Sequence, residues 1–199
     1  MHQRCFPVHD FIAAIIAKRE KCYLYLYLRH MTNTESAFPH APMLAGLAPV
    51  VAPGIRILVL GSFPGNASLA ARQYYAHSRN QFWGLLSSVL SEDLTAISYE
   101  LRLRRLLAHC IGLWDAIDAC ERRGSLDSSI RNARPNDFSF LRQNCPLLKR
   151  VCFNGKASGR FAQRFADAGY ETLVLPSSSP AHARLSFDQK LAAWRKIIC

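Results

Sequence analysis

The sequence predicts an α/β fold, a three-layer α/β/α sandwich around a central, mainly parallel four-stranded sheet. Four short apolar runs have the length and composition of buried strands, at residues 56–60, 112–117, 150–153 and 172–175. Between these runs the apolar residues recur at helical spacing. Strands that alternate with helices are joined by right-handed crossovers, so the sheet is expected to be parallel and covered on both faces.

Helices are expected where the apolar residues follow that spacing, at residues 82–90, 103–107, 138–141 and 161–165. A last helix is predicted to begin at a capping box formed by Ser186 and Gln189, with Trp194 on its apolar face. In sheets of this kind ligands bind beyond the carboxyl ends of the strands. Functional residues are therefore expected just after each strand.

The composition favours one domain with an anionic partner. The chain has 199 residues, half of them hydrophobic, and a formal net charge of +11 with an isoelectric point near 9.7. Without residues 1–50, 20 basic and 11 acidic residues are left, so most of the charge belongs to the main domain. Such a charge suits nucleic acid or an anionic membrane surface, and charge alone does not choose between them.

Residues 1–50 differ in composition from the rest and are predicted to be an N-terminal extension, either disordered or an over-extended start, before a domain at 51–199. Tyrosine and leucine alternate at 23–28, and a polar stretch that contains prolines follows. Met31 and Met43 both precede the first predicted strand. An over-extended start site and a basic N-terminal arm are both open interpretations.

The cysteines and the apolar segments exclude several classes of protein. Seven cysteines, an odd number with no C-x-x-C spacing, fit neither a disulfide framework nor a zinc or iron–sulfur site. Free thiols in a reducing cytosol are expected, with no metal and no cofactor. Residues 11–28 are fairly apolar, but four consecutive charged residues interrupt them, so neither a signal peptide nor a membrane span is predicted.

Four segments carry the candidate chemistry because each lies at or just after the end of a predicted strand. Two glycines around a proline let the backbone approach a ligand, and a serine run offers hydroxyl and N–H groups to phosphate oxygens. Each segment taken singly is also typical of a structural turn. The segments are Gly61-Ser62-Phe63-Pro64-Gly65, Leu113-Trp114-Asp115, Phe153-Asn154-Gly155-Lys156 and Leu175-Pro176-Ser177-Ser178-Ser179-Pro180.

Together the motifs of residues 55–198 resemble the uracil-DNA glycosylase superfamily, in which a water-activating loop follows the first strand and a DNA-gripping Ser/Pro loop the last. Within it, they are similar to the hypoxanthine-DNA glycosylase family. The resemblance implies a repair enzyme that flips hypoxanthine out of DNA and hydrolyses its N-glycosidic bond, with no lyase step. The matching motifs are the first segment with Ser68-Leu69, the block 74–83, Gly112 to Asp115, Gly124 to Asp127, Phe153 to Gly155 and Leu175 to Ser179.

The resemblance implies that Asn80 positions the hydrolytic water. Mismatch-specific relatives carry a water-positioning Asn where this chain has Phe63, and in hypoxanthine-type enzymes the Asn of the Arg-Asn-x-Phe-Trp segment takes that role. Asn is also a favoured N-cap, so capping of a helix that begins near Gln81 is the alternative. The turn would meet the departing base with backbone N–H groups, with Ser62 and Phe63 in the catalytic set and Gly61, Pro64 and Gly65 against the base.

Base recognition is expected from Asp115, because an ionised carboxylate only accepts hydrogen bonds and suits the N1–H of hypoxanthine. A helix cap or a salt-bridge partner is the alternative for this residue. Phe63 is expected either to stack on the flipped base or to be a core residue in a turn. His77 is expected to orient sugar or phosphate, or to make a structural hydrogen bond. The other expected substrate contacts are Tyr75, Trp114 and Asn154.

DNA binding is expected at the last strand end and at one lysine. Lys156 and Ser177, Ser178 and Ser179 would contact phosphates. Relatives insert a bulky wedge where this chain has Pro180, Ala181 and His182, so the wedge is small here. The expected partner is single- or double-stranded DNA with deaminated bases, bound by a monomer in a bacterial cytoplasm near the nucleoid.

The sequence leaves two other functions open and disfavours a third. The lesion could instead be uracil or thymine opposite guanine. The chain could be a DNA-binding module without activity. A hydrolase triad of Ser178, His182 and Asp188 is disfavoured, because no G-x-S-x-G elbow occurs and the spacing is too local.

Overall fold

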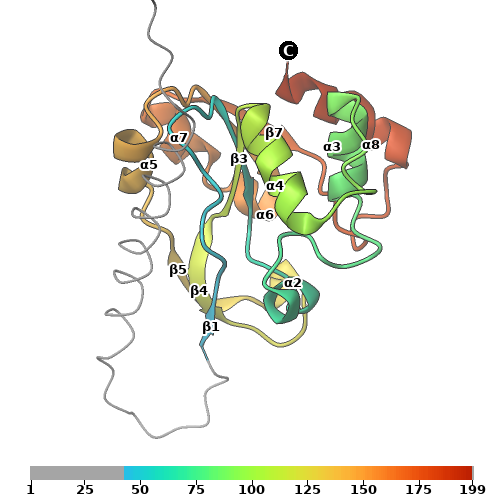
Figure 1. Ribbon diagram of the computed structural model, residues 1–199. Coiled ribbons are helices and arrows are strands. Elements are labelled where there is room, and N and C mark those ends of the chain that lie inside the picture. Colours follow the sequence, from blue (N-terminus) through green and yellow to red (C-terminus); the bar gives the residue numbers. More distant parts are fainter. Residues whose placement is uncertain (1–42, 199) are drawn as a thin grey trace, which may run out of the picture. The chain divides into compact units, whose positions relative to one another are not determined.

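The structure is a computed structural model that describes residues 43–198 (Figure 1). The tyrosine–leucine alternation and the two interpretations of the N-terminal extension lie outside the described residues. Residues 44–50 contribute to the sheets of the domain. Strand β1 (Leu44–Ala45) pairs with another strand, and Val50 forms an isolated bridge with Leu113. The boundary of the extension stays a prediction.

The central sheet has four parallel strands in the order β3-β2-β6-β7. Their bounds are β2 (Ile57–Gly61), β3 (Ile111–Asp115), β6 (Arg150–Asn154) and β7 (Glu171–Leu175). The four predicted strands and their parallel pairing are confirmed. Gly61 pairs with Asp115 and Asn154 with Leu175, so neighbouring strands end at the same level.

Helices cover both faces of this sheet, as a parallel sheet requires (Figure 1). On one face α3 (Phe82–Leu90), α4 (Tyr99–Ala108) and α8 (Phe187–Trp194) pack against Val59 and Leu113. On the other, α5 (Ser139–Asn144) and α7 (Ala162–Asp167) pack against Leu60 and Trp114. The capping box of the last helix is confirmed, since Ser186 and Gln189 exchange both hydrogen bonds.

A second, antiparallel sheet was not predicted. Its strands β1, β4 (Ile117–Glu121) and β5 (Arg131–Pro135) pair in the order β1-β4-β5. The predicted strand 112–117 is therefore wrong at its end. The apolar run continues, but the N–H groups of Ala116 and Ile117 donate to the carbonyls of Gly61 and Ser62, and the chain leaves the parallel sheet.

Short elements complete the fold: α2 (Asn66–Ala71), α6 (Lys156–Gly159), and the 3-10 turns η1 (Asp127–Ser129) and η2 (Arg195–Ile197). Within residues 43–198, no helix is long and apolar enough to cross a membrane, and no group of three or more His, Cys, Asp or Glu could hold a metal ion. The cysteines at 110, 120, 145 and 152 are free thiols.

Candidate active site

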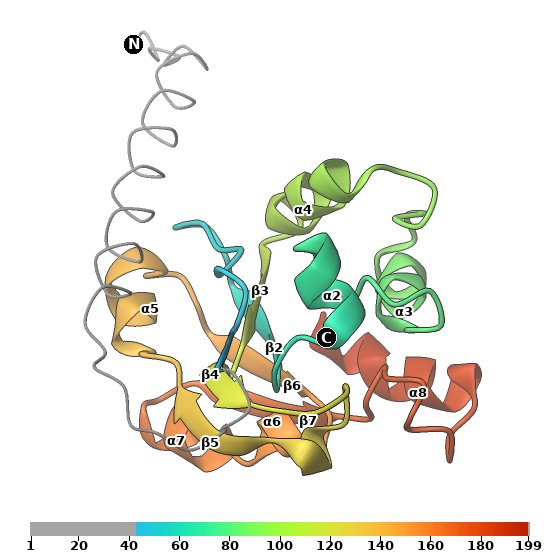
Figure 2. The same cartoon turned by 90° about the horizontal axis from the view of Figure 1, so that it is seen from below.

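The carboxyl ends of the parallel strands bring three of the predicted residues together. Figure 2 views the molecule from the side of these strand ends. Alternate residues of a strand point to opposite faces. Gly61, Asp115 and Asn154 therefore share the face of Val59, Leu113 and Cys152, which α3 and α8 cover. The site lies at this edge, between the sheet and the segment that leads into α3.

Asp115, Gly61 and Tyr75 form the bottom of the site. A Cβ atom at Gly61 would collide with Asp115 Oδ1 and lie 3.1 Å from the Tyr75 hydroxyl, so only glycine fits there. Tyr75 has a left-handed backbone, with φ of 55°, and its ring stacks on Phe82 at 3.6 Å between centroids. Asp115 Oδ2 and the Tyr75 hydroxyl are buried and make no hydrogen bond of good geometry among residues 43–198, although the Asn154 side chain lies close enough to the Tyr75 hydroxyl to oppose the rise of its pKa. Buried polar atoms without partners are rare and typical of functional sites.

The pKa of Asp115 is raised to about 7, chiefly by burial and also by the negative charge of Asp127, while the cation of Arg122 opposes both. From the sequence this carboxyl is expected to be ionised. Near neutral pH it instead exchanges between both forms, because a residue with 3 % of its surface exposed loses most of its hydration. The alternatives of a helix cap or a salt bridge find no support. Asp115 ends a strand and takes part in none of the ion pairs of the described chain.

Asn80 lies at the amino end of α3, beside the site. Its side-chain Oδ1 accepts a hydrogen bond of 3.0 Å from the Phe82 N–H, and its own N–H donates to the His77 carbonyl. The N-cap residue of α3 is Gln81, whose side chain makes no capping bond, so Asn80 lies one residue before the cap and binds the first N–H of the helix in an Asx turn. An amide oxygen has a second lone pair, so this bond fixes the orientation of Asn80 and leaves one acceptor position for water. Asn80 can therefore bind the helix N–H and position a water at the same time.

Gln81 and Lys190 connect the start of α3 to the last strand and to α8. The Gln81 N–H donates to the Ser178 carbonyl at 3.0 Å, and Lys190 Nζ donates to Gln81 Oε1 at 2.8 Å. Lys190 is 2 % exposed, and burial lowers its pKa. The sequence analysis missed this lysine. Its spacing of four residues from Trp194, on the apolar face of α8, is the signal that could have found it.

The Ser/Pro segment is held by Asn154. Asn154 Nδ2 donates to the Ser178 hydroxyl and Asn154 Oδ1 accepts from the Ser178 N–H, both at 2.8 Å. Ser178 is fully buried, so its hydroxyl fixes the loop and does not face a phosphate. The triad alternative is excluded, because Ser178 bonds Asn154, and His182 Nδ1 has no partner in the described part of the chain. Burial and nearby cations lower the pKa of His182.

The remaining residues of this segment lie closer to solvent. The hydroxyl of Ser177 accepts from the Ser179 N–H, and that of Ser179 from the Ala181 N–H. Pro180 and Ala181 are exposed, as is Lys156 at the start of α6. His77 is also exposed, and its Nδ1 accepts from the Arg79 N–H, which is the structural hydrogen bond expected as its alternative.

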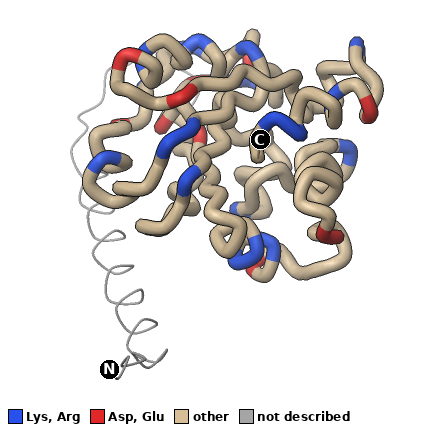
Figure 3. Tube along the Cα trace, turned by 90° about the horizontal axis from the view of Figure 1, so that it is seen from above, with Lys and Arg blue, Asp and Glu red and all other residues tan. Residues whose placement is uncertain are grey.

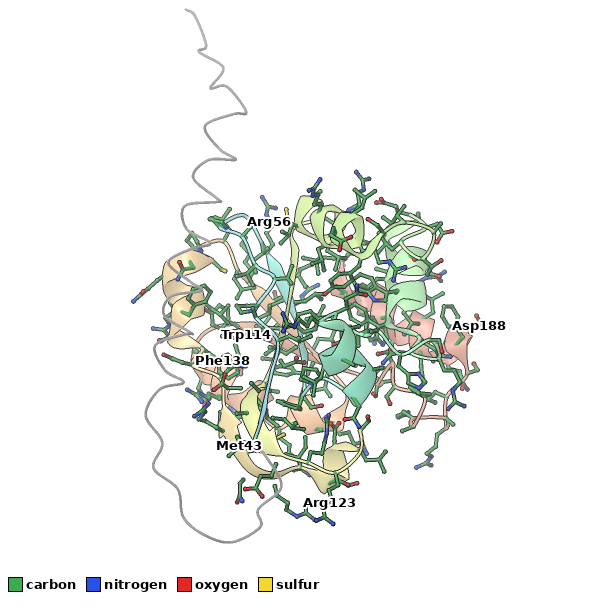
Figure 4. All side chains as sticks on the ribbon, turned by 60° about the horizontal axis from the view of Figure 1, so that its bottom comes forward. Met43, Arg56, Trp114, Arg123, Phe138 and Asp188 are labelled. Carbon is green, nitrogen blue, oxygen red and sulfur yellow. The ribbon has the colours of Figure 1, made fainter. Side chains whose placement is uncertain are left out.

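Two predicted site residues are core residues instead. Phe63 is 6 % exposed and packs on Ile117 and Cys120, with the guanidinium of Arg122 at 5.0 Å from its ring. Trp114 is 6 % exposed and packs edge-to-face on Phe138 at 5.6 Å, on the face of the sheet away from Asp115 (Figure 4). Neither ring lies open to a base. Burial of a large aromatic surface explains both positions.

The turn 62–65 is bonded to the loop 122–130, to which the sequence analysis assigned no role. Ser62 Oγ donates to Asp127 Oδ1 at 2.6 Å, and Arg122 Nη2 donates to the Pro64 carbonyl at 2.6 Å. The Asn66 N–H donates to Ser125 Oγ at 3.0 Å. A separate cavity of about 290 Å³ lies between α5 and α7, and none of the predicted site residues lines it.

The parallel sheet has at its carboxyl edge a polar site that is bordered by a glycine and contains buried polar atoms without hydrogen-bond partners. These features define an α/β protein that binds a ligand at this edge. The chain matches the uracil DNA glycosylase superfamily over residues 48–198 and belongs to it. It is thus a DNA repair glycosylase, a hydrolase that acts on N-glycosyl bonds and has DNA as its substrate.

Relatives support this assignment. A hypoxanthine DNA glycosylase of Methanosarcina barkeri is 44% identical over 149 residues, which cover 75% of this chain and 94% of the relative. A second, from Methanosarcina acetivorans, is 40% identical over 76% of this chain and 96% of the relative. The solution NMR structure of a Methanosarcina acetivorans protein described as a uracil DNA glycosylase has a TM-score of 0.71 and 38% identity, and covers 78% of this chain and 99% of that chain.

Proposed function

We propose that this protein releases hypoxanthine from deoxyinosine in DNA by hydrolysis of the N-glycosidic bond, without a lyase step. The observation that carries the proposal is the buried pair of Asp115 Oδ2 and the Tyr75 hydroxyl, which make no hydrogen bond and which the missing side chain of Gly61 lets lie against the strand end. Such atoms suit the polar edge of a base that is taken out of the stack. The names of the relatives favour hypoxanthine as that base.

Asp115 would select the base through its ionised form. A carboxylate accepts the N1–H of hypoxanthine, and adenine has no hydrogen at that position. A pKa of about 7 means that this form becomes the major one above neutral pH. Because Asp115 Oδ2 and the Tyr75 hydroxyl are closed to water in this structure, the base must displace the side chains that cover them.

Asn80 would orient the attacking water through its carbonyl oxygen. A neutral amide is no base, so its contribution is the position of the water against the sugar carbon, on the order of a few kcal/mol. Its bond to the Phe82 N–H supports this role, because it holds the amide in one rotamer. The departing base would meet the backbone of the turn 62–65, whose N–H groups need no proton transfer.

The DNA would lie along the exposed strand-end loops. Lys156 and the hydroxyls of Ser177 and Ser179, which accept one bond each and can still donate, offer donors to phosphates on one side of the site. Figure 3 shows lysines and arginines spread over the described part of the chain, in agreement with a basic main domain. We propose that the enzyme acts as a monomer on single- or double-stranded DNA in the bacterial cytoplasm, close to the nucleoid.

The test is a panel of oligonucleotides that contain inosine, uracil, xanthine or a G:T mismatch. Release of hypoxanthine at the highest rate supports the proposal. Release of uracil alone would instead favour the uracil specificity named for the solved relative. Binding without release of any base would make the chain a DNA-binding module.

A further inference from the structure

One large apolar side chain is exposed in a loop at the edge of the active site. Leu126 is 55% exposed and lies between β4 and β5, directly before η1. An isolated exposed leucine is common on protein surfaces, so its exposure alone assigns no role. The position of its loop and the charges around it are the features that distinguish it.

The loop is fixed to the turn that forms the site. Both neighbours of Leu126 are anchored: the hydroxyl of Ser125 accepts from the Asn66 N–H, and Asp127 accepts from Ser62. Arg122 adds a third bond, to the Pro64 carbonyl. Leu126 therefore keeps a set position relative to the base-binding turn. The other exposed large apolar side chains of residues 43–198 belong to no segment bonded to this turn; they are Met43, Leu101, Leu147, Val174 and Ile198.

Cations flank this apolar tip. Arg123 is exposed and projects from the loop away from the body of the molecule (Figure 4). On the other side Arg131 is also exposed, and its Nη1 donates to the Ser128 and Ile130 carbonyls, which holds its charge in the loop. An exposed apolar residue with an exposed arginine before and after it in the chain suits DNA, in which stacked bases lie between two rows of phosphates.

The loop after β7 lacks a large apolar side chain where relatives insert a wedge into DNA. The exposed residues at this place are Pro180 and Ala181, and neither has a long apolar side chain that could fill the space that a flipped nucleotide leaves. An unfilled gap in the stack costs free energy and favours return of the base. Phe63, the nearest aromatic candidate in the turn, is buried and not free to enter DNA.

We infer that Leu126 inserts into the base stack beside the flipped nucleotide and keeps the duplex open, with Arg123 on the adjacent phosphates. The inference rests on the proposed function, because it assumes that DNA lies across this edge. It assigns the loop 122–130 as a second DNA-contacting segment, in addition to the loop after β7.

The test compares L126A and L126M on two substrates that contain deoxyinosine. One is a perfect duplex, and the other places the lesion in an unpaired internal loop, where no stack has to be displaced. For L126A the ratio of kcat/KM on the duplex to that on the open substrate should fall about fivefold, as expected when roughly half the burial of one leucine is lost. L126M keeps an apolar side chain of similar length and should retain the ratio.

Leu147 provides the matched control. It is 50% exposed but precedes β6, at the opposite edge of the sheet, so L147A should leave the ratio unchanged. An unchanged ratio for L126A, or an equal loss on both substrates, would overturn the inference.

A measurement that does not depend on release of hypoxanthine uses 2-aminopurine next to a G:T mismatch. Its fluorescence should rise on binding of the unaltered protein and rise less with L126A, even if the released base proves not to be hypoxanthine.

Discussion

Asp115 shows how a single residue can be kept at a cost to stability. Its carboxyl is buried, and burial raises its pKa from 3.8 to about 7. In the unfolded chain the group ionises near pH 3.8, so between these pH values folding has to take up a proton. The protonated carboxyl of Asp115 therefore adds its full share to the stability of the fold below about pH 3.8, and this share is lost as pH rises through 7.

Asp115→Asn should therefore stabilise the protein at alkaline pH. Asparagine resembles the protonated carboxyl, so the penalty of up to about 4 kcal/mol that the ionised group imposes should disappear. Thermal unfolding at a series of pH values measures this effect. The variant should have the higher Tm at pH 8, and the difference should vanish toward pH 4. A constant difference across this range would show that Asp115 does not titrate with a raised pKa.

Asn80→Ala tests the water-positioning role against the role in the Asx turn. Loss of the bond to the Phe82 N–H should cost about 1 kcal/mol of stability, as for helix caps. Loss of the oriented water should in addition lower kcat by about 100-fold or more, with DNA binding preserved.

Ser186→Ala is the matched control for that variant. It removes the side-chain cap of α8, with a similar expected loss of stability, and no role in the reaction is assigned to Ser186. A comparable loss of kcat in both variants would reduce Asn80 to a structural residue at the start of α3.

At the scale of elements, the ribbon β4–β5 and its loop control the charge around the site. Arg122 lowers the pKa of Asp115 and Asp127 raises it. Both also anchor the turn 62–65, through Pro64 and Ser62. Tyr74 and Tyr75, the other titratable groups close to the carboxyl, stay neutral because burial raises their pKa.

Arg122→Met and Asp127→Asn should therefore move the pH profile of kcat/KM in opposite directions. If the ionised carboxyl reads the base, activity rises with pH as Asp115 loses its proton. The rising limb should shift to higher pH in Arg122→Met and to lower pH in Asp127→Asn. Arg122→Met removes a bond to the turn, and Asp127→Asn replaces the charged acceptor of the Ser62 bond with a neutral amide oxygen, so a purely structural effect would lower activity and shift neither limb.

The sequence predicted the elements whose pattern is set by burial, and missed those that are not. The four buried strands and the capping box at Ser186 were found because apolar runs and caps are local signals. Strand β5 was missed because all five of its residues are exposed and mostly polar. Its pairing with β4 across the loop 122–130 decides that it is a strand, and such pairing is not written in the pattern of either segment alone.

The same distinction holds for the site. Gly61, Asp115 and Asn154 were predicted from their place at strand ends and do share one face. Trp114 was placed with them but lies one residue earlier in the strand, and a step of one residue reverses the face. The bond between Ser62 and Asp127 spans 65 residues of sequence, so only the folded chain reveals it.

At the scale of the whole molecule, the charge of the described domain should govern its encounter with DNA. A protein that neutralises phosphates releases counterions, and its affinity falls steeply with salt. Lys156→Gln, at the strand-end edge, should weaken binding of duplexes with and without a lesion to the same extent. It should also reduce the slope of log K against log salt by about 1, the value for one phosphate contact.

Lys149→Gln is the control, because this exposed lysine directly precedes β6 at the opposite edge. Fluorescence anisotropy over a range of salt concentrations gives both slopes. If the two variants change the slope equally, the DNA does not lie along the strand-end edge, and the charge acts as a diffuse attraction over the whole surface.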